Sequence, residues 1–182
     1  MIITSIGLVE LTAIARGVET ADAMLKAAEV TLVFAKPVCP GKFIIMIYGD
    51  VGAVKASVAA GLNVGADRVV NHLIIPRIHP DLLPAINGSY EVGDVEALGV
   101  VEFFDIASAI TAADAAAKSS TVRLAEVRLG LGIGGKSFFK LSGEVADVKS
   151  AVAAAIGAGT GGQVVSSCVI PAPDPALFRE MV

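Results

Sequence analysis

The chain repeats itself once along its length, and this repeat limits the folds that it can adopt. Residues 6–10 (IGLVE) recur as residues 98–102 (LGVVE), so that Gly7 is matched by Gly99. Further matched segments follow in the same order, and the offset grows from 92 residues (99 − 7) to 95 residues (170 − 75). Because the offset changes only between predicted elements, where loops absorb insertions, we expect two copies of one small domain.

Each copy shows the same order of predicted elements. Alternating or continuous apolar runs predict strands, and apolar positions three or four residues apart predict helices. Asp50 is a candidate N-cap, and Pro76 ends the last strand of the first copy. The order β-α-β-β-α-β predicts a ferredoxin-like domain of the α/β (α+β) class. In the first copy the expected elements are strand 5–11, helix 14–28, strand 31–36, strand 43–48, a helix from Asp50 to about residue 61, and strand 69–75.

The repeat also predicts the domain organisation. The matched elements of the second copy extend from about residue 97 to residue 170, and residues 84–95, which are rich in turn formers, join the two copies. We therefore expect a first domain at residues 1–90 and a second domain at residues 91–182.

The composition is apolar for a chain of this kind. Hydrophobic residues make up 54% of the 182 residues and charged residues 18%, against roughly 25% charged residues in typical domains. Charges nevertheless interrupt every run that is long enough to span a membrane, and the first charge, Glu10, comes too late for the basic start of a signal peptide. We expect a cytosolic protein that buries apolar surface in an oligomer. The net charge of −4 argues against a nucleic-acid partner.

A glycine-rich segment of the second copy matches a phosphate-binding pattern. Residues 130–137 (GLGIGGKS) fit G-x-x-x-x-G-K-S/T. Such a loop binds phosphate when a helix begins directly after it. Residues 137–143 instead have the composition of a strand and match the predicted strand 43–48. We therefore expect a turn between two strands, with a nucleotide-binding protein as the alternative that the motif alone would support.

The two histidines do not form a recognisable catalytic group. His72 lies in a predicted strand and His79 in a turn, and neither has a nucleophile or a set of metal ligands near it in the sequence. The sequence offers no acid–base pair or activated nucleophile elsewhere. We therefore expect that the protein is not an enzyme.

The two cysteines occupy different places in the repeat. Cys39 lies in the turn after the second strand, where the second copy has Ile133. Cys168 lies in the last strand, at the position of Leu73 in the first copy, and we expect it to be buried as a small apolar residue. One cysteine in a turn is a weak metal signal. From the residues alone, Cys39 is expected to be a free thiol.

Several segments resemble the domains of bacterial microcompartment shell proteins (BMC domains). They are residues 7–10 (GLVE), 21–26 (ADAMLK), 49–55 (GDVGAVK) and 75–79 (IPRIH). The tandem, unpermuted arrangement and residues 38–43 (VCPGKF) are most similar to the T-type shell proteins of propanediol-utilisation compartments. This resemblance implies a structural protein of the microcompartment shell. It also implies that three chains of two domains form a pseudo-hexameric tile with a central pore, and that tiles pack edge to edge with other shell proteins.

The resemblance assigns roles to the turns as well. In T-type relatives the turn after the second strand lines the pore, and one cysteine from each of three chains holds a 4Fe–4S cluster. In this sequence that role, as cofactor and metal ligand, falls on Cys39. Threefold symmetry would leave one iron open to another ligand; zinc and a metal-free pore are the alternatives. The implied pore-lining residues are Val38, Cys39, Pro40, Ile133 and Gly134.

Three basic residues are implied at the tile edges. Lys26 and Lys118 lie near the end of the first helix of each copy, and Arg77 lies in the turn after the last strand of the first copy. The corresponding turn of the second copy, residues 171–174 (PAPD), has no arginine. We therefore expect the six edges of the tile to differ.

These observations lead to three functional hypotheses. The first is a shell tile whose iron–sulfur cluster moves electrons, or the cluster itself, across the shell to a redox partner inside the compartment. The second is the same tile with a metal-free pore for metabolites. The third is a ferredoxin-like protein that binds a small molecule.

Overall fold

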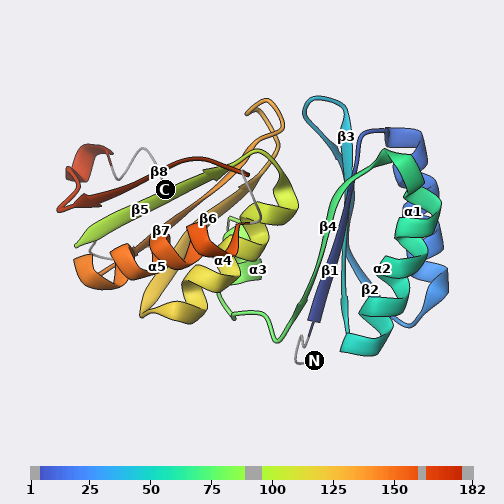
Figure 1. The fold of residues 1–182 in the computed structure, drawn as a ribbon, viewed down its shortest axis with the longest axis horizontal. Helices are drawn as coiled ribbons and strands as arrows, with labels where there is room; N and C mark the ends of the chain where they lie inside the picture. The colour runs from blue at the N-terminus through green and yellow to red at the C-terminus, as the bar shows by residue number, and fades with distance from the viewer. Residues whose placement is uncertain (1–4, 89–95, 160–162, 178–182) are drawn as a thin grey trace. The chain divides into compact units, whose positions relative to one another are not determined.

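The computed structural model describes residues 5–88, 96–159 and 163–177. The chain divides into two compact units, one formed by Met1–Ile78 with Gly130–Gly135 and the other by His79–Leu129 with Lys136–Val182. Each unit contains one four-stranded sheet with two long helices on one face (Figure 1). The glycine-rich segment 130–135 belongs to the first unit, although the strands on either side of it belong to the second.

The first unit has the predicted β-α-β-β-α-β order. Every strand pair is antiparallel, and the strand order in the sheet is β2-β3-β1-β4. The predicted strands and helices are therefore confirmed for this copy. The elements are β1 (Ser5–Leu11), α1 (Ile14–Ala27), β2 (Thr31–Val38), β3 (Lys42–Gly49), α2 (Val51–Gly65), a short 3-10 helix (Ala66–Arg68) and β4 (Val69–Pro76).

The second unit repeats this fold, with the antiparallel strand order β6-β7-β5-β8. The predicted joining segment 84–95 begins within a short helix, and its residues 89–95, which include the expected domain boundary, lie outside the described residues. The prediction of two copies of one fold is confirmed. The elements are α3 (Leu82–Ile86), β5 (Ala97–Phe103), α4 (Ile106–Ser119), β6 (Val122–Leu129), β7 (Ser137–Gly143), α5 (Val145–Ala158) and β8 (Val164–Pro171).

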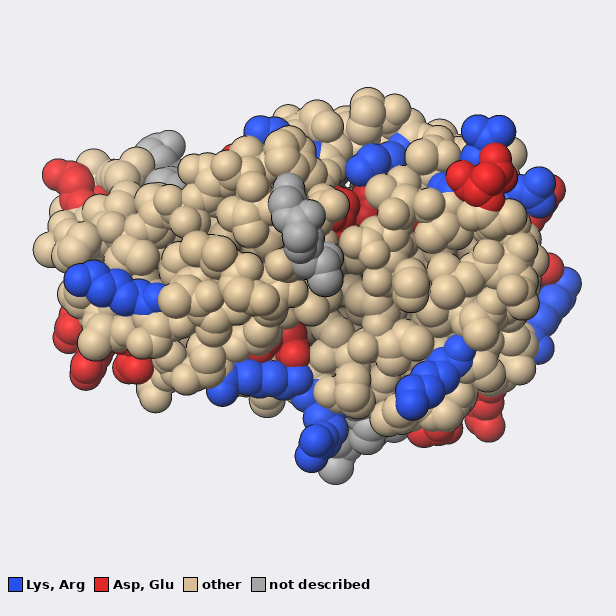
Figure 2. Space-filling view, in the orientation of Figure 1, with Lys and Arg blue, Asp and Glu red and all other residues tan. Residues whose placement is uncertain are grey.

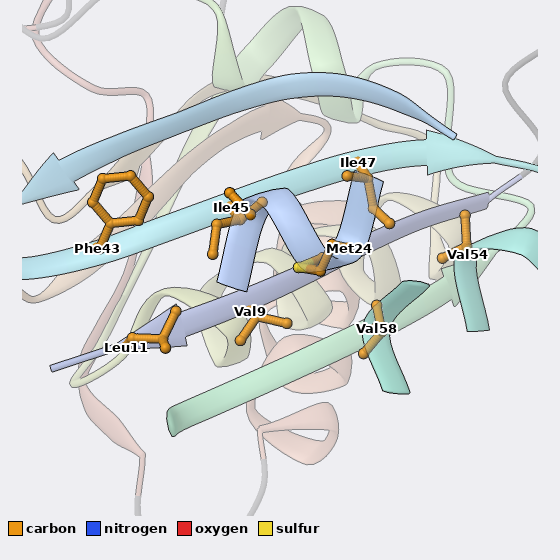
Figure 3. Close-up of a cluster of buried hydrophobic side chains, with 9 residues drawn as sticks. Val9, Leu11, Met24, Phe43, Ile45, Ile47, Val54 and Val58 are labelled. Atoms are coloured by element: carbon orange, nitrogen blue, oxygen red, sulfur yellow. The ribbon is translucent and has the colours of Figure 1, made fainter. Parts of the chain in front are cut away.

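The core of the first unit lies between its sheet and helices α1 and α2. Gly7 on β1 allows α2 to approach closely, because a Cβ at this position would lie 2.6 Å from Val58 Cγ2. Burial of each large apolar side chain in such a cluster stabilises the fold by about 1.5–3 kcal/mol. The cluster (Figure 3) consists of Val9, Leu11, Ala21, Met24, Phe43, Ile45, Ile47, Val54 and Val58.

Helix α2 begins where the sequence predicts and ends later. Asp50 Oδ1 accepts hydrogen bonds from the N–H groups of Gly52 at 2.8 Å and Ala53 at 3.0 Å, which confirms the N-cap. The helix extends to Gly65 rather than to about residue 61. Gly61 does not end it. Met24 of α1 packs where a side chain at position 61 would lie, since a Cβ there would be 2.7 Å from Met24 Cγ.

The matched helices of the two units differ in burial. On α1, Ile14 and Val18 are 46% and 57% exposed. At the same positions of α4, Ile106 and Ile110 are fully buried. The first unit therefore presents an apolar helix surface whose counterpart in the second unit is covered.

The sheet faces that point away from the helices also differ in burial, but here the exposed face belongs to the second unit. In the first unit, Leu8 on β1 and its strand partner Leu73 on β4 are buried. In the second unit, the matched Val100 is only half-buried and its partner Cys168 is exposed. The second unit therefore presents a sheet face whose counterpart in the first unit is covered.

The face of the molecule drawn in Figure 2 carries few charges. Lys and Arg side chains, like Asp and Glu side chains, lie in small separate groups on a largely uncharged face (Figure 2). Among the described residues, none of the helices is both long enough and apolar enough to cross a membrane.

Candidate functional site

The turn between β2 and β3 presents the predicted ligand. Cys39 is a free thiol that is half-buried, and it lies between buried Val38 and exposed Pro40. The N–H of Gly41 donates to the carbonyl oxygen of Val38 at 3.0 Å and closes the turn. Gly41 has a φ of 95°, in the left-handed region that favours glycine. The chain therefore holds Cys39 at the tip of a hairpin.

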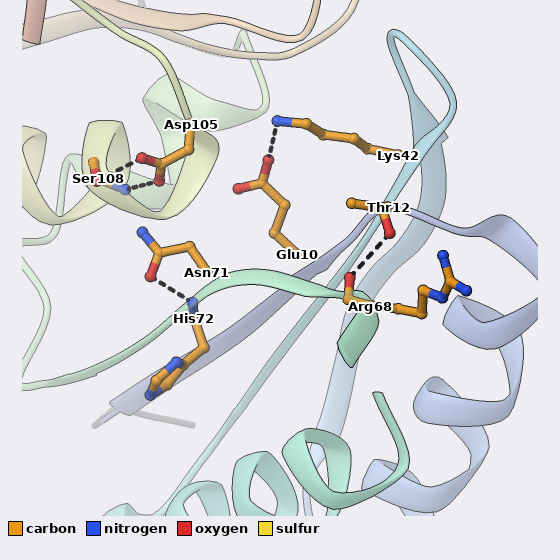
Figure 4. Close-up of polar contacts among 8 residues, drawn as sticks. All are labelled: Glu10, Thr12, Lys42, Arg68, Asn71, His72, Asp105 and Ser108. Carbon is orange, nitrogen blue, oxygen red and sulfur yellow. Dashed lines mark hydrogen bonds and ion pairs between the residues drawn. The ribbon is translucent and has the colours of Figure 1, made fainter. Parts of the chain in front are cut away.

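An ion pair anchors the base of this turn. Lys42, the first residue of β3, places its Nζ 2.8 Å from Glu10 Oε1 on β1 (Figure 4). The Glu10 side chain is fully buried and that of Lys42 is 19% exposed. In the second unit Lys136 Nζ lies 2.6 Å from Glu102 Oε1, but these side chains are 41% and 30% exposed. Both copies keep the pair, which the sequence analysis missed although the repeat matches both partners.

The turn between β6 and β7 is built from glycines in the left-handed region. The four glycines of residues 130–135 have φ values between 66° and 81°. Ile133 is half-buried in this turn and Gly134 is exposed. Strand β7 follows at Ser137, so the helix that a phosphate-binding loop requires is replaced by a strand. The prediction of a turn between two strands is confirmed.

The exposed sheet face of the second unit carries a charged cluster. Lys140 Nζ on β7 lies 2.6 Å from Glu126 Oε2 on β6, and the Lys140 side chain is only 4% exposed. Arg128 Nε donates to Glu126 Oε1 at 2.7 Å. The Lys140 and Arg128 cations lie 5.9 Å and 5.5 Å from the centre of the Phe138 ring. This face is polar, whereas the matched position of Lys140 in the first copy is the apolar Met46.

The two predicted edge lysines each pair with an aspartate one helical turn earlier. Lys26 Nζ lies 2.6 Å from Asp22 Oδ2, and both side chains are exposed. Lys118 pairs with Asp114, a nearly buried residue that also accepts a hydrogen bond from the N–H of His79 at 2.7 Å. The aspartate of the Lys118 pair is therefore held by a second hydrogen bond, while both side chains of the Lys26 pair are exposed.

The turn after the last strand has the same backbone form in both copies. Arg77 has a φ of 51° and Ala172, its counterpart, a φ of 46°. A non-glycine residue in this region costs about 1–2 kcal/mol. Both copies keep this turn, but only the first places an exposed cation there.

The histidines lie apart from any catalytic group. His72 is exposed on β4, and its N–H donates to Asn71 Oδ1 at 2.8 Å. His79 Nδ1 accepts from the N–H of Asp81 at 3.3 Å. Within the described ranges, the chain brings together no group of three or more His, Cys, Asp or Glu side chains that could hold a metal ion.

The prediction that Cys168 is buried is wrong. Cys168 is exposed on β8, an outer strand of its sheet. It pairs with Val100, which faces away from the helices, because the neighbouring Gly99 packs against Val148 and Val152 of α5. The helices therefore cover the opposite face of this strand.

Comparison with known proteins decides the family. The model of the BMC domain matches residues 5–78 and, a second time, residues 97–173. The chain belongs to the BMC-domain family. This tandem BMC-domain protein is 46% identical over 179 residues to the bacterial microcompartment shell protein PduT of Citrobacter freundii, covering 98% of this chain and 97% of that protein.

Two further relatives match the whole chain and a single domain, respectively. The crystal structure of a microcompartment protein from Desulfitobacterium hafniense DCB matches with a TM-score of 0.88 and 52% identity, covering 98% of this chain and 99% of that one. The carboxysome shell protein CcmK2 of Synechococcus elongatus is 42% identical over 82 residues, 43% of this chain and 80% of CcmK2. The BMC-domain protein described here is thus a non-enzymatic, structural component of a bacterial microcompartment shell.

Proposed function

We propose that three copies of this shell protein form a tile whose central pore holds a 4Fe–4S cluster between three Cys39 thiolates. The observation that carries the proposal is the free Cys39 thiol at the tip of the β2–β3 turn. The full-length similarity to PduT supports it. The tile would close the shell and pass electrons, or the cluster, across it to a redox partner inside the compartment.

The difference in burial between the two copies supports a head-to-tail ring. The α1 surface around Val18 is exposed while its counterpart on α4 is buried, and the sheet face around Val100 is uncovered while its counterpart around Leu8 is buried. Each chain therefore has one exposed helix surface, which is apolar, and one exposed sheet face, which carries the charged cluster of Lys140, Glu126 and Arg128. Docking the first of these on the second of the next chain gives a heterologous contact, which closes into a ring when the rotation allows it. A ring of three chains contains six domains.

The donor chemistry of the turn fits an iron–sulfur cluster when three chains share it. Thiolate sulfur is the usual ligand of such clusters, and Cys39 offers one sulfur per chain that is free of any disulfide. A cubane usually takes four cysteines, so three leave one iron for water or an external ligand. When bound, the cluster supplies one-electron transfer at a potential that depends on solvent exposure and on hydrogen bonds to sulfur.

The residues of the chain itself would hold the thiol and shape the pore. Val38 is buried and fixes the end of β2, and Pro40 restricts the backbone after the cysteine. The buried pair of Lys42 and Glu10 fixes the start of β3. The proposed pore lining consists of Val38, Cys39, Pro40, Ile133 and Gly134.

The proposed tile contacts its neighbours through Lys26, Arg77 and Lys118. Arg77, Lys26 and Lys118 are all exposed, as an edge contact requires, and Lys118 also pairs with Asp114. We further propose that the two domains occupy residues 1–90 and 91–182, which contain one BMC match each. The neighbours would be other shell proteins of the same compartment.

A metal-free pore for metabolites is the second candidate. The observation that favours it is that Cys39 supplies one thiol per chain, so that three chains offer fewer sulfur ligands than the four that a cubane usually takes. In this case the tile is the same, and Cys39 narrows the pore without holding a metal.

Anaerobic purification from iron-replete cells tests both proposals. We expect a mass of about 55 kDa, three times 18.4 kDa, a brown colour, and about four iron and four sulfide ions per trimer. Cys39→Ser should lose the iron and the colour and keep the trimer mass. Cys168→Ser is the matched control and should keep all three.

Each outcome separates the two candidates. A colourless, iron-free wild-type trimer would support the metal-free pore and contradict the cluster. A monomer of 18.4 kDa would contradict both, because a threefold pore needs three chains.

A further inference from the structure

The glycine-rich segment 130–135 lies against the turn that carries Cys39. It is grouped with the first unit, although it connects two strands of the second. The N–H of Cys39 donates to the carbonyl oxygen of Gly130 at 3.3 Å. The N–H of the candidate ligand is therefore hydrogen-bonded to the glycine-rich turn, while the carbonyl oxygen of the same peptide group, that of Val38, accepts from Gly41 within the hairpin.

The next peptide group, between Cys39 and Pro40, also lies close to this segment. Gly135 is buried, and a Cβ at this position would lie 2.6 Å from the carbonyl oxygen of Cys39 and 2.7 Å from Pro40 Cδ. Real Cβ atoms essentially never approach other atoms so closely. Only glycine allows this backbone contact without a shift of the Cys39 turn.

The neighbouring glycines do not have this role. Gly132 and Gly134 have φ values of 75° and 66°, close to the 81° of Gly135. A Cβ at Gly132 or Gly134 would meet nothing within 4 Å. The three glycines thus share one backbone conformation, and only Gly135 is required by the space next to Cys39.

The Cys39 turn is consequently held in two ways. Its ends are fixed within the first copy, by the hydrogen bond from Gly41 to Val38 and by the Lys42–Glu10 ion pair. Its tip contacts the segment from the second copy through both peptide groups that flank the Cys39 Cα, at the N–H of Cys39 and at its carbonyl oxygen. A ligand is useful to a metal centre when its direction is set before the metal binds, and the groups behind it usually set that direction.

We propose that residues 130–135 are a positioning element that sets the direction of the Cys39 thiol, with Gly135 as the decisive residue. This inference rests on the proposed role of Cys39 as a cluster ligand. It explains why the matched turns of the two copies have diverged so far: one supplies the sulfur, and the other, with its glycines, supports the backbone of that sulfur. The resemblance of the segment to a phosphate-binding loop follows from the same need for close backbone approach.

Gly135→Ala and Gly134→Ala form a matched pair of variants. Both place alanine at a left-handed position, so the backbone penalty is shared, and only Gly135→Ala adds an atom against Cys39. In the cluster-loaded trimer, we expect Gly135→Ala to lose iron to a chelator about tenfold faster, and to alter the EPR spectrum of the reduced cluster. Gly134→Ala should resemble the wild type in both measurements.

A second readout does not need the cluster. In metal-free protein with the Cys168→Ser background, Cys39 is the sole cysteine of the chain, and its rate of alkylation by iodoacetamide reports its orientation and access. We expect this rate to change at least about fivefold in Gly135→Ala and less than twofold in Gly134→Ala, as expected when a support behind a ligand is lost. Equal rates in both variants and the wild type, or equal changes in both variants, would overturn the proposal.

Hydrogen exchange of the Cys39 amide tests the proposal in the wild-type protein, and so does not depend on the folding of Gly135→Ala. In the wild-type trimer, the Cys39 amide should exchange slowly with solvent because it donates to Gly130. Exchange as fast as that of an exposed turn amide would overturn the proposal. A wild-type trimer without iron that still shows this protection would contradict the cluster and leave the positioning element supported.

Discussion

Replacing Lys42 with methionine measures what the buried ion pair contributes to stability. Methionine keeps the length and the apolar stem of the side chain but removes the ammonium group that lies 2.8 Å from Glu10 Oε1. Because the Glu10 side chain is fully buried, it cannot gain water in place of the lost cation. Breaking a buried pair from one side costs about 3–5 kcal/mol. We expect about 3 kcal/mol, the low end, because Glu10 has further polar contacts.

The matched pair in the second unit provides the control. Lys136→Met breaks the same contact, at 2.6 Å, between side chains that are 41% and 30% exposed. A pair that remains in contact with water contributes about 0–1 kcal/mol. The double variant Glu10→Gln with Lys42→Met should recover part of the lost stability, because it also removes the buried negative charge that the lysine compensates.

Urea unfolding followed by far-ultraviolet circular dichroism is the assay, at one fixed protein concentration because association contributes to the midpoint. The expected order of midpoints is wild type, then Lys136→Met slightly below it, and Lys42→Met well below both. Equal losses in the two single variants would refute the argument from burial. A double variant no more stable than Lys42→Met would refute the argument that the buried charge of Glu10 causes the loss.

Three other substitutions test the packing at Gly7, the helix cap at Asp50 and the exposed surface of α1. Gly7→Ala should destabilise the protein by about 1–3 kcal/mol, since the new Cβ would lie 2.6 Å from Val58. The control Gly157→Ala in α5 meets nothing within 4 Å and should stabilise the protein by up to about 0.5 kcal/mol. The same change in stability in both variants in urea unfolding would contradict the packing argument. Asp50→Ala removes the acceptor of two backbone N–H groups and should lower stability by about 1 kcal/mol in urea unfolding, so an unchanged midpoint would show that the cap is dispensable. Val18→Asp charges the exposed surface of α1 and should give an 18.4 kDa species in light scattering with an unchanged circular dichroism spectrum; a variant of normal trimer mass would rule out docking through α1.

The sequence was sufficient for the fold because the repeat reports each element twice. A single apolar run such as residues 31–36 is compatible with several structures, but its match at the same place in a second copy fixes the order of elements. Asp50 was identifiable as a cap because the interaction is local: it joins residues two and three positions apart. Most of the fold can therefore be predicted from local interactions and from the sequence repeat.

The contacts that the sequence did not predict all depend on neighbours distant along the chain. Gly61 looks like a helix breaker until Met24 of another helix is seen to pack on it. Cys168 has the composition of a core strand around it, but alternation along a strand does not say which face is covered. The glycine pattern predicts a turn at Gly135, but the approach of Gly135 to the backbone of Cys39 joins segments from different copies. Periodicity identifies an apolar face, whereas packing decides what covers it.

The unequal edges of the two domains have a consequence for how tiles are laid into a sheet. A unit with true sixfold symmetry can occupy a site of a hexagonal array in one orientation only. In the proposed trimer, exposed Arg77 alternates around the rim with Ala172, and exposed Asp22 with the nearly buried Asp114. Such a unit has two distinguishable orientations at each site, related by one sixth of a turn, and each offers different partners to its neighbours. A sheet containing this protein can therefore select one orientation over the other, which a sheet of identical domains cannot do.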